Sequence, residues 1–373
     1  MVYLDYSATT PVLPEVLDSY IKVTNEYFGN PNSLHSLGIK SKELLNSALK
    51  QICNLLNIKE KEAIFTSGAT ESNNMALIGT ALARGKKGSR IVVSKLEHES
   101  IYGICNYLEE NGFIIDYVNN DSDGVIDFED LKRIIKPETI LVSICAVNSE
   151  LGIRQPLKTI KQIITKENSN VIFHTDITQA LGKVPVNLSD VDLASMSSHK
   201  IYGPKGIGLL YKKESLTIKP LQYGSASVYK PGTPPLPLIV TFSKALRIAL
   251  SDLTKKEAKI AKYNDKICQH LKKHQDILVN KTKYSIPHIL NISLMNIKPE
   301  TFIHALESHD IYVGSNTACS KNKISTAVLN LYQDKTRALT TIRISLSYLT
   351  KNEEINIFLN NFDLIYGRLR ELK

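Results

Sequence analysis

Residues 171–200 form the sequence VIFHTDITQALGKVPVNLSDVDLASMSSHK. The segment begins with an apolar run of strand length that ends in a carboxylate, Asp176, and it closes on an amine, Lys200. In α/β sheets, ligands bind outside the carboxyl ends of the strands, which is where a side chain such as Asp176 lies. The segment therefore indicates both the fold class and the part of the fold that carries the site.

Segments typical of strands and of helices alternate through the first two thirds of the chain. Short apolar runs at 63–66, 90–94 and 141–146 predict strands, and the patterns at 37–57 and 71–84 predict helices. Alternation of this kind predicts an α/β fold with a mostly parallel central sheet and helices on both of its faces.

The pattern changes near residue 222, where glycine and proline crowd into a loop that ends at residue 237. A long helical stretch is predicted over 237–276, and the remainder of the chain is typical of a smaller α+β unit. We therefore expect two domains. Residues 14–255 form the large one, and residues 1–13 together with 256–373 form the small one.

The composition is that of a globular protein, with 43% hydrophobic and 22% charged residues. No apolar stretch approaches the roughly 20 residues that span a bilayer, and the first residues lack the pattern of a signal peptide. The five cysteines, at positions 53, 105, 145, 268 and 319, have no spacing typical of a disulfide framework or a metal site. We expect a soluble cytoplasmic protein with no metal and no membrane contact.

The net charge is +9, and much of it comes from lysines scattered along polar helix faces. No helix-turn-helix, zinc-finger or RNA-binding aromatic pattern accompanies this charge. We interpret it as a solvated surface and expect no direct contact with nucleic acid.

Lys200 and Asp176 together point to one cofactor. The amine of Lys200 is suited to form a Schiff base, and Ser197 and His199 beside it are suited to bind a phosphate. The carboxylate of Asp176 is suited to hold a protonated ring nitrogen. A lysine Schiff base paired with an acid on the pyridinium nitrogen is what pyridoxal 5'-phosphate (PLP) requires of a protein.

Further polar positions follow strand-like runs, and most of them have a structural alternative. Gln179 lies one turn after Asp176, where it can bond a phenolic oxygen; Asp176 itself can instead cap a helix from Thr178. His98 can stack on a pyridine ring and shuttle protons, although a lone histidine is more often structural. The small residues of segment 66–73 suit either an anion-binding loop or a helix cap.

Two positions point to substrate chemistry. Cys319 lies in the polar segment 314–323 near lysines, where it is either a thiolate nucleophile or an ordinary loop cysteine. Arg343 interrupts the apolar run 341–346 and needs an anionic partner, which is either a substrate carboxylate or a core acid. The residues alone leave both pairs of alternatives open.

Segments in a consistent order along nearly the whole chain resemble PLP-dependent cysteine desulfurases. These belong to the class-V aminotransferase-like family, which includes the iron–sulfur-cluster and nitrogenase-associated enzymes. The matching segments are YLDYSATTP (3–11), FGNPNS (28–33), FTSGATESN (65–73), VNSELG (147–152), those around Asp176 and Lys200, and IRISL (342–346). The resemblance implies a fold-type I PLP-dependent transferase that forms a homodimer, with active sites at the subunit interface.

The resemblance also implies roles for the residues that match the family's motifs. The residues implied to act in catalysis are Lys200, Cys319 and His98. The residues implied to bind the cofactor are Ala69, Thr70, His98, Asn148, Asp176, Gln179, Ser197, His199, Lys200 and, from the neighbouring subunit, Thr233. The residues implied to bind the substrate are Asn30, Asn148 and Arg343.

The implied activity is removal of sulfur from L-cysteine, which gives L-alanine and a persulfide on Cys319. The sulfur then passes to an acceptor protein, either an iron–sulfur cluster scaffold or a tRNA-thiolation enzyme. The alternatives are a selenocysteine lyase or cysteine sulfinate desulfinase of the same fold, and a non-catalytic binding homologue. The segments 223–233 and 316–327 depart from the family's common sequences, so the dimer contact of the first and the acceptor served by the second stay open.

Overall fold

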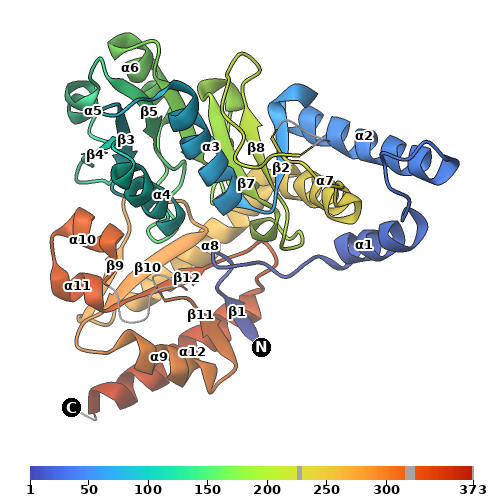
Figure 1. Cartoon of the computed structure of the whole chain (residues 1–373). Coiled ribbons are helices and arrows are strands. Elements are labelled where there is room, and N and C mark those ends of the chain that lie inside the picture. The colour runs from blue at the N-terminus through green and yellow to red at the C-terminus, as the bar shows by residue number, and fades with distance from the viewer. Residues whose placement is uncertain (225–228, 316–323, 372–373) are drawn as a thin grey trace.

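Seven strands form the central sheet of the computed structural model, which describes residues 1–224, 229–315 and 324–371 (Figure 1). In spatial order they are β2 (Ala63–Thr66), β8 (Gly208–Lys212), β7 (Leu193–Ser197), β6 (Ile172–Asp176), β5 (Thr139–Ser143), β3 (Arg90–Ser94) and β4 (Ile114–Val118). Neighbouring strands run parallel except in the two pairs that include β8. The predicted mostly parallel sheet is therefore confirmed.

Each face of this sheet has its own apolar core. Phe173 and Ile172 are neighbours on β6 and lie in different cores, because successive strand side chains point to opposite faces. The helices on the Phe173 face are α2 (Ser36–Leu56), α5 (Phe128–Ile134), α6 (Leu157–Glu167) and α7 (Leu236–Leu250). The helices on the Ile172 face are α3 (Ala69–Arg84) and α4 (Glu99–Glu110). Burial on both faces explains why the strands are continuous apolar runs.

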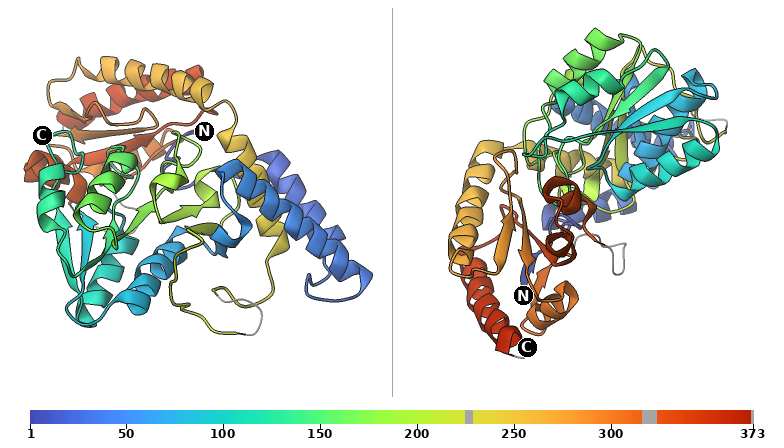
Figure 2. Two further views of the ribbon diagram at one scale, coloured as in Figure 1. Left: turned by 90° about the horizontal axis from the view of Figure 1, so that it is seen from above. Right: turned by 90° about the vertical axis from the view of Figure 1, so that its left-hand side faces the viewer.

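A smaller body packs beside the first, as the right-hand view of Figure 2 shows. Its strands are β9 (Ile277–Asn280), β10 (Ile289–Leu294) and β12 (Thr341–Ser345) in one antiparallel sheet, and β1 (Val2–Leu4) and β11 (Ile311–Val313) in a parallel pair. Its helices are α8 (Leu253–Leu271), α9 (Pro299–Glu307), α10 (Thr326–Tyr332), α11 (Lys335–Leu339) and α12 (Asn352–Glu371). Phe302, Phe358 and Phe362 form aromatic edge contacts in its core.

The N-terminal segment connects the two bodies. Leu4 on β1 is fully buried in the core of the smaller body, because β1 pairs with β11 there. Six residues later, the backbone N–H of Thr10 donates to the carbonyl of His199 (2.9 Å), just past β7 of the large sheet. Residues 5–10 therefore pass between the bodies at the carboxyl end of β7.

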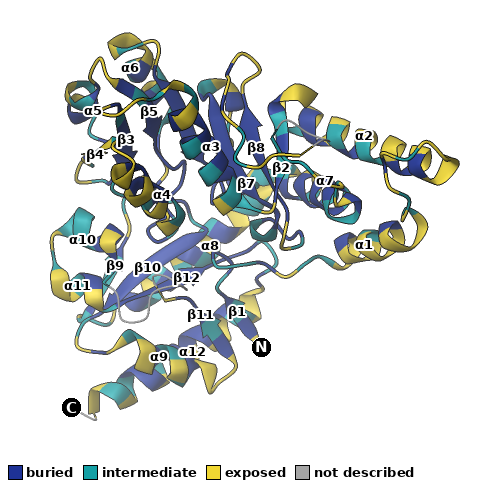
Figure 3. Ribbon diagram, in the orientation of Figure 1, coloured by how far each residue is buried: buried dark blue, intermediate teal, exposed yellow. Residues whose placement is uncertain are grey.

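Two helices, α1 (Pro14–Glu26) and α2, extend away from the rest of the chain in Figure 1. In Figure 3 the strands of the large sheet are buried, whereas α1 and α2 carry long exposed faces. Several exposed residues there are apolar: Leu17, Ile21, Phe28, Leu34, Leu37 and Ile39. Exposed apolar side chains gathered in one region indicate an interaction surface.

One element differs from its prediction. The helical stretch 237–276 is interrupted between α7 and α8, where Asp252 adopts a left-handed backbone conformation (φ 51°). A single left-handed residue breaks the helical hydrogen-bond ladder and redirects the chain. The domain boundaries after residues 13 and 255 stay a prediction.

No helix in the described part of the chain has the length and apolar character needed to cross a bilayer. The described residues also contain three short 3-10 turns, at Glu60–Glu62, Leu188–Asp190 and Ser198–Lys200. The third lies directly after β7 and carries the lysine on which the predicted chemistry depends.

Leu4→Ala tests whether the N-terminal strand is part of the second core. We expect it to lower the free energy of unfolding by roughly 2–5 kcal/mol, because it leaves a cavity among fully buried side chains. Urea denaturation measures the change, with the half-exposed Leu364→Ala as a control. Equal, small effects of both substitutions would show that β1 contributes little to the core.

Candidate active site

A cavity of about 380 Å³ lies at the carboxyl ends of β6 and β7, a volume typical of a small-molecule site. Its walls come from the segments after β2, β3, β5, β6 and β7, which parallel strands bring to one edge of the sheet. The sequence-predicted residues that line it are Ala69, Thr70, His98, Asp176, Gln179, Ser197, His199 and Lys200.

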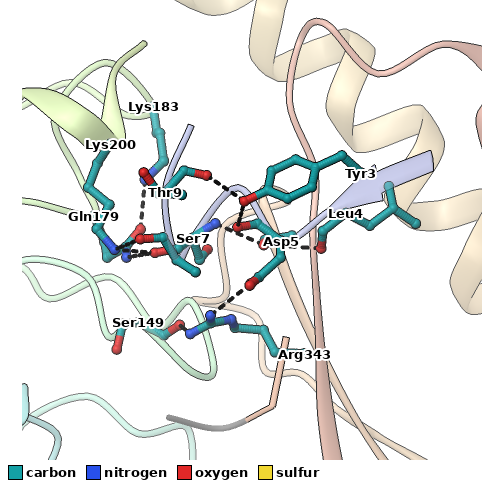
Figure 4. Close-up of polar contacts among 12 residues, drawn as sticks. Tyr3, Leu4, Asp5, Ser7, Thr9, Ser149, Gln179, Lys183, Lys200 and Arg343 are labelled. Carbon is teal, nitrogen blue, oxygen red and sulfur yellow. Dashed lines mark hydrogen bonds and ion pairs between the residues drawn. The ribbon is translucent and has the colours of Figure 1, made fainter. Parts of the chain in front are cut away.

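Lys200 is held by the N-terminal segment. Its ammonium group donates to the carbonyl oxygen of Ser7 and to that of Ala8, the latter at 2.8 Å. Gln179 donates from Nε2 to the same Ser7 oxygen (3.0 Å), as Figure 4 shows. The residues that cross between the two bodies thus fix both the candidate Schiff-base lysine and its neighbouring amide.

The carboxylate of Asp176 is buried and anchored at both oxygens. Oδ1 accepts from the backbone N–H of Thr178 (2.9 Å), and Oδ2 accepts from Nδ2 of Asn73 (2.9 Å). The residues after Asp176 form turns rather than the helix that its structural alternative required. Neutral donors hold the carboxylate in place without neutralising its charge, as a partner for a ring cation requires.

A hydrogen-bonded chain leads from Asp176 to His98. Asn73 Nδ2 also contacts Oγ of Ser100 (3.0 Å), and that hydroxyl lies 2.9 Å from Nδ1 of His98. The backbone N–H of Ser100 donates to the same Nδ1 (3.2 Å), so Nδ1 acts as an acceptor. The neutral ring therefore carries its proton on Nε2.

Another part of the cavity suits an anion. Helix α3 begins there, and no hydrogen bond from a side chain in the described residues caps its first turn. A helix start offers free N–H groups and a favourable dipole to a phosphate. Ser197, His199 and Lys205 line the same cavity. Burial lowers the pKa of His199 to about 4, helped by the nearby charges of Lys200, Lys205 and Lys183, so its imidazole is neutral.

Arg343 forms an ion pair with an acid of the chain, as its structural alternative expects, although that acid, Asp5, is only partly buried. Nη2 forms an ion pair with Oδ1 of Asp5 (3.0 Å), and Nη1 donates to the carbonyl of Ser149 (3.1 Å). Its Nε has no hydrogen-bond partner within the ranges that the structure describes. Arg343 does not line the cavity itself, but Ser149 does, so the guanidinium lies one residue behind the wall.

Three other predicted site residues do not border the cavity in the described chain. Asn148 uses its amide on the backbone, accepting from the N–H groups of Glu150 and Leu151 and donating to the carbonyl of Leu96. Asn30 is exposed between α1 and α2, and Thr233 is exposed in the loop before α7. Cys319 lies outside the described residues.

Sequence reasoning missed several residues that shape the site. Asn73 lies within segment 66–73, whose pattern indicates an anion-binding loop or a helix cap, and Ser100 sits two residues after His98 without any motif of its own. Asp5 and Ser7 lie in the N-terminal segment 3–11, which resembles the family but has no chemical motif of its own. Lys183 looks like one more surface lysine, yet it is buried.

Glu97 is a buried acid directly behind the cavity wall. Its Oε1 accepts from the hydroxyl of Ser94 (2.5 Å) and the backbone N–H of Cys145 (2.7 Å). Its Oε2 has no partner among the described residues. Burial raises the pKa of Glu97 to about 8, and the nearby charge of Asp176 adds to the effect. The group is therefore largely protonated at neutral pH.

A family model for class-V aminotransferases matches residues 2–358. The chain belongs to the class-V aminotransferase family. Its relatives include a NifS/IcsS protein homolog of Lactobacillus delbrueckii subsp. bulgaricus, 39% identical, with 100% of this chain and 99% of the relative covered. A cysteine desulfurase IscS of Dictyoglomus turgidum is 34% identical, with coverages of 100% and 96%.

A solved structure of a NifS-like protein superposes on this class-V aminotransferase with a TM-score of 0.93. The two are 33% identical, and the superposition covers 98% of this chain and 99% of the other. The predicted fold-type I architecture is confirmed, and with it the PLP cofactor of this family. The cavity fits that cofactor, because a lysine, an anchored carboxylate and an uncapped helix start surround a single space.

The titration of Glu97 generates a stability prediction. The pKa of Glu97 is about 8 in the folded protein, above the ordinary value of 4.5. The contribution of this group to the stability of the folded protein is therefore complete below pH 4.5 and is lost as the pH rises from 4.5 to about 8. Glu97→Gln, which resembles the protonated acid, should gain stability relative to wild type by about 1 kcal/mol for each pH unit between about pH 5 and pH 8. Urea denaturation across this range tests it, with exposed Glu99→Gln as control; a constant difference would contradict the assignment.

Proposed function

We propose that this protein is a PLP-dependent cysteine desulfurase, which removes sulfur from L-cysteine and gives L-alanine. The observation that carries the proposal is the placement of Lys200 and the anchored Asp176 on one cavity. A full-length relative is itself a cysteine desulfurase, which supports the choice of substrate within the family.

PLP, when bound, supplies an electron sink for the bonds of an amino acid attached to it. Asp176 would hold the ring nitrogen of the cofactor, because its two hydrogen bonds fix the carboxylate in the cavity. The N-terminus of α3, with Ser197 and His199, would hold the phosphate. The amide of Gln179, which lines the same cavity, would bond the phenolic oxygen.

Two groups in the cavity move protons. The Lys200 amine is held at the cavity by the carbonyls of Ser7 and Ala8, and there it would act as a base toward the substrate. His98 presents its Nε2–H at the cavity, with Nδ1 held by Ser100. The chain from His98 through Ser100 and Asn73 to Asp176 fixes the tautomer of the imidazole.

Arg343 is the residue proposed to bind the substrate carboxylate. Its guanidinium lies behind Ser149. Nε lacks a partner in the described chain, whereas Nη2 forms the ion pair with Asp5. A bidentate contact to a carboxylate needs two N–H groups in the geometry that arginine provides. Asn148, one residue from Ser149, fixes the same backbone segment through its side-chain hydrogen bonds.

Cys319 is the proposed sulfur acceptor on the enzyme. Its thiolate attacks the substrate sulfur, the carbon–sulfur bond breaks with its electron pair left on carbon, and the sulfur remains as a persulfide. The persulfide then serves an acceptor protein in the cytoplasm, either a cluster scaffold or a tRNA-thiolation enzyme. The departures in segment 316–327 favour a dedicated acceptor.

We further propose a homodimer built on α1 and α2. Apolar side chains there, among them Phe28 and Leu34, are exposed to water in a single subunit. A partner surface would bury them. Asn30 lies on the same exposed segment, and Thr233 is likewise exposed and off the cavity of its own subunit. A second copy that covers this surface would bring both residues to a neighbouring site.

The sulfur-accepting role of Cys319 is tested by mass spectrometry after incubation with L-cysteine. We expect one added sulfur on the peptide that contains Cys319, and none after Cys319→Ala or Lys200→Ala. The matched control is Cys268→Ala, which removes a half-buried thiol and should leave the adduct intact. Sulfur release from cysteine that persists in Cys319→Ala would contradict the proposal and favour a lyase of the selenocysteine type.

The dimer surface is tested by replacing Phe28 and Leu34 together with aspartate. Two charges placed in an apolar interface should halve the mass measured by light scattering, because burying an unpaired carboxylate is costly. Leu364→Asp, at an exposed position on α12, is the control and should keep the dimer. A wild-type monomer, or a dimer that survives both aspartates, would contradict this surface.

A further inference from the structure

Lys183 is a buried amine that the proposed mechanism does not use. It lies in the turn after β6, seven residues beyond Asp176, and only 8% of its surface is exposed. Lysine is almost never buried to this extent without a partner, because removing an ammonium from water is costly. The partner here is Gln179, whose Oε1 lies 2.7 Å from the Lys183 ammonium.

This contact decides which end of the Gln179 amide is available to a ligand. An ammonium group is a donor without acceptor capacity, so it can contact the oxygen of an amide but not its N–H₂ group. At the other end, Nε2 of Gln179 donates one hydrogen to the carbonyl of Ser7. Gln179 lines the cavity, so the second N–H is the group left for a pocket oxygen.

The charged surroundings make this arrangement costly. Burial, together with the nearby charges of Lys200 and Arg343, lowers the pKa of Lys183 to about 7. Lys183 in turn lowers the pKa values of His199 and of buried His288. The groups around Lys183 are all basic, namely Lys200, Arg343, His199 and His288. The positive charge of Lys183 is therefore unfavourable there and needs a compensating role. Figure 4 shows Lys183 reaching past Lys200 toward Gln179.

We propose that Lys183 is a positioning residue whose ammonium fixes the Gln179 amide so that it donates an N–H to the phenolic oxygen of the cofactor. The inference rests on the proposed PLP site, but it assigns a role to a residue outside the cavity. Lys183 acts through Gln179 and does not touch the cofactor or the substrate itself.

The test is a pH titration of the holoenzyme's cofactor absorbance, recorded without substrate. In Lys183→Met the midpoint between the cofactor's two absorbance forms should move to higher pH by about one unit, as expected for a lost hydrogen bond to a charged group. Losing the N–H donor and the positive charge both favour the protonated form of the cofactor. Gln179→Ala should shift the midpoint in the same direction.

A double-mutant cycle separates this role from a structural one. If Lys183 acts through Gln179, the shifts of the two single variants will not add in the Lys183→Met/Gln179→Ala protein. The matched control is Lys212→Met, because Lys212 is also buried but donates to the carbonyl of Leu216 (2.7 Å), away from the cavity. It should lower stability without moving the midpoint.

Separate outcomes overturn separate parts of the account. An unchanged midpoint in Lys183→Met, or fully additive shifts, would overturn the role of Lys183. Should Lys183→Met fail to fold, Gln179→Glu keeps a partner for the lysine while removing the N–H; an unchanged midpoint there would overturn the donor role. A wild-type protein that shows no PLP absorbance band would instead overturn the proposed function.

Discussion

The hydrogen bonds from Lys200 to the carbonyls of Ser7 and Ala8 are the interaction on which the rest of the site depends. They join residues separated by more than 190 positions, and they form at the point where the N-terminal segment leaves one core and reaches the other. Backbone carbonyls are fixed acceptors, so they define where the amine lies before any ligand is present. The same segment anchors Gln179 through Ser7 and Arg343 through Asp5. A shift of residues 5–8 would therefore displace the cofactor side and the proposed substrate side of the site together.

Charge is distributed unevenly around the cavity. Asp176, the acid that lines the cavity, is held by neutral hydrogen-bond donors. The second buried acid, Glu97, is largely protonated at neutral pH because burial raises its pKa to about 8. The basic groups Lys200 and Arg343 lie close enough to Lys183 to lower its pKa. A cavity with one anchored carboxylate and an excess of basic groups suits a ligand that carries a phosphate and a carboxylate, which matches PLP with an attached amino acid.

The sequence predicted most of the fold because strands buried on both faces are apolar runs that a reader recognises without long-range information. Lys200 and Asp176 were found for a related reason: each follows such a run, and parallel strands bring their carboxyl ends together. The break at Asp252 was missed because a left-handed residue between two helices leaves only a weak local signal. The contacts of Asn73 with Asp176 and of Asp5 with Arg343 were missed because they join distant segments, 338 residues apart in the second case.

Asn30 and Thr233 lie away from the cavity of their own subunit, and Cys319 lies outside the described residues, so the roles of all three stay sequence-based predictions. The buried lysine shows the opposite situation. No pattern distinguishes Lys183 from the many solvated lysines of this basic chain, and only its burial and its contact with Gln179 reveal a different role.

A crystal structure of the protein purified with its cofactor is the most direct measurement of the central claim. The account predicts continuous electron density between Nζ of Lys200 and the PLP aldehyde carbon, with a carboxylate oxygen of Asp176 within hydrogen-bonding distance of the ring nitrogen. Density that places PLP elsewhere, or joins it to another lysine such as Lys205, would contradict it.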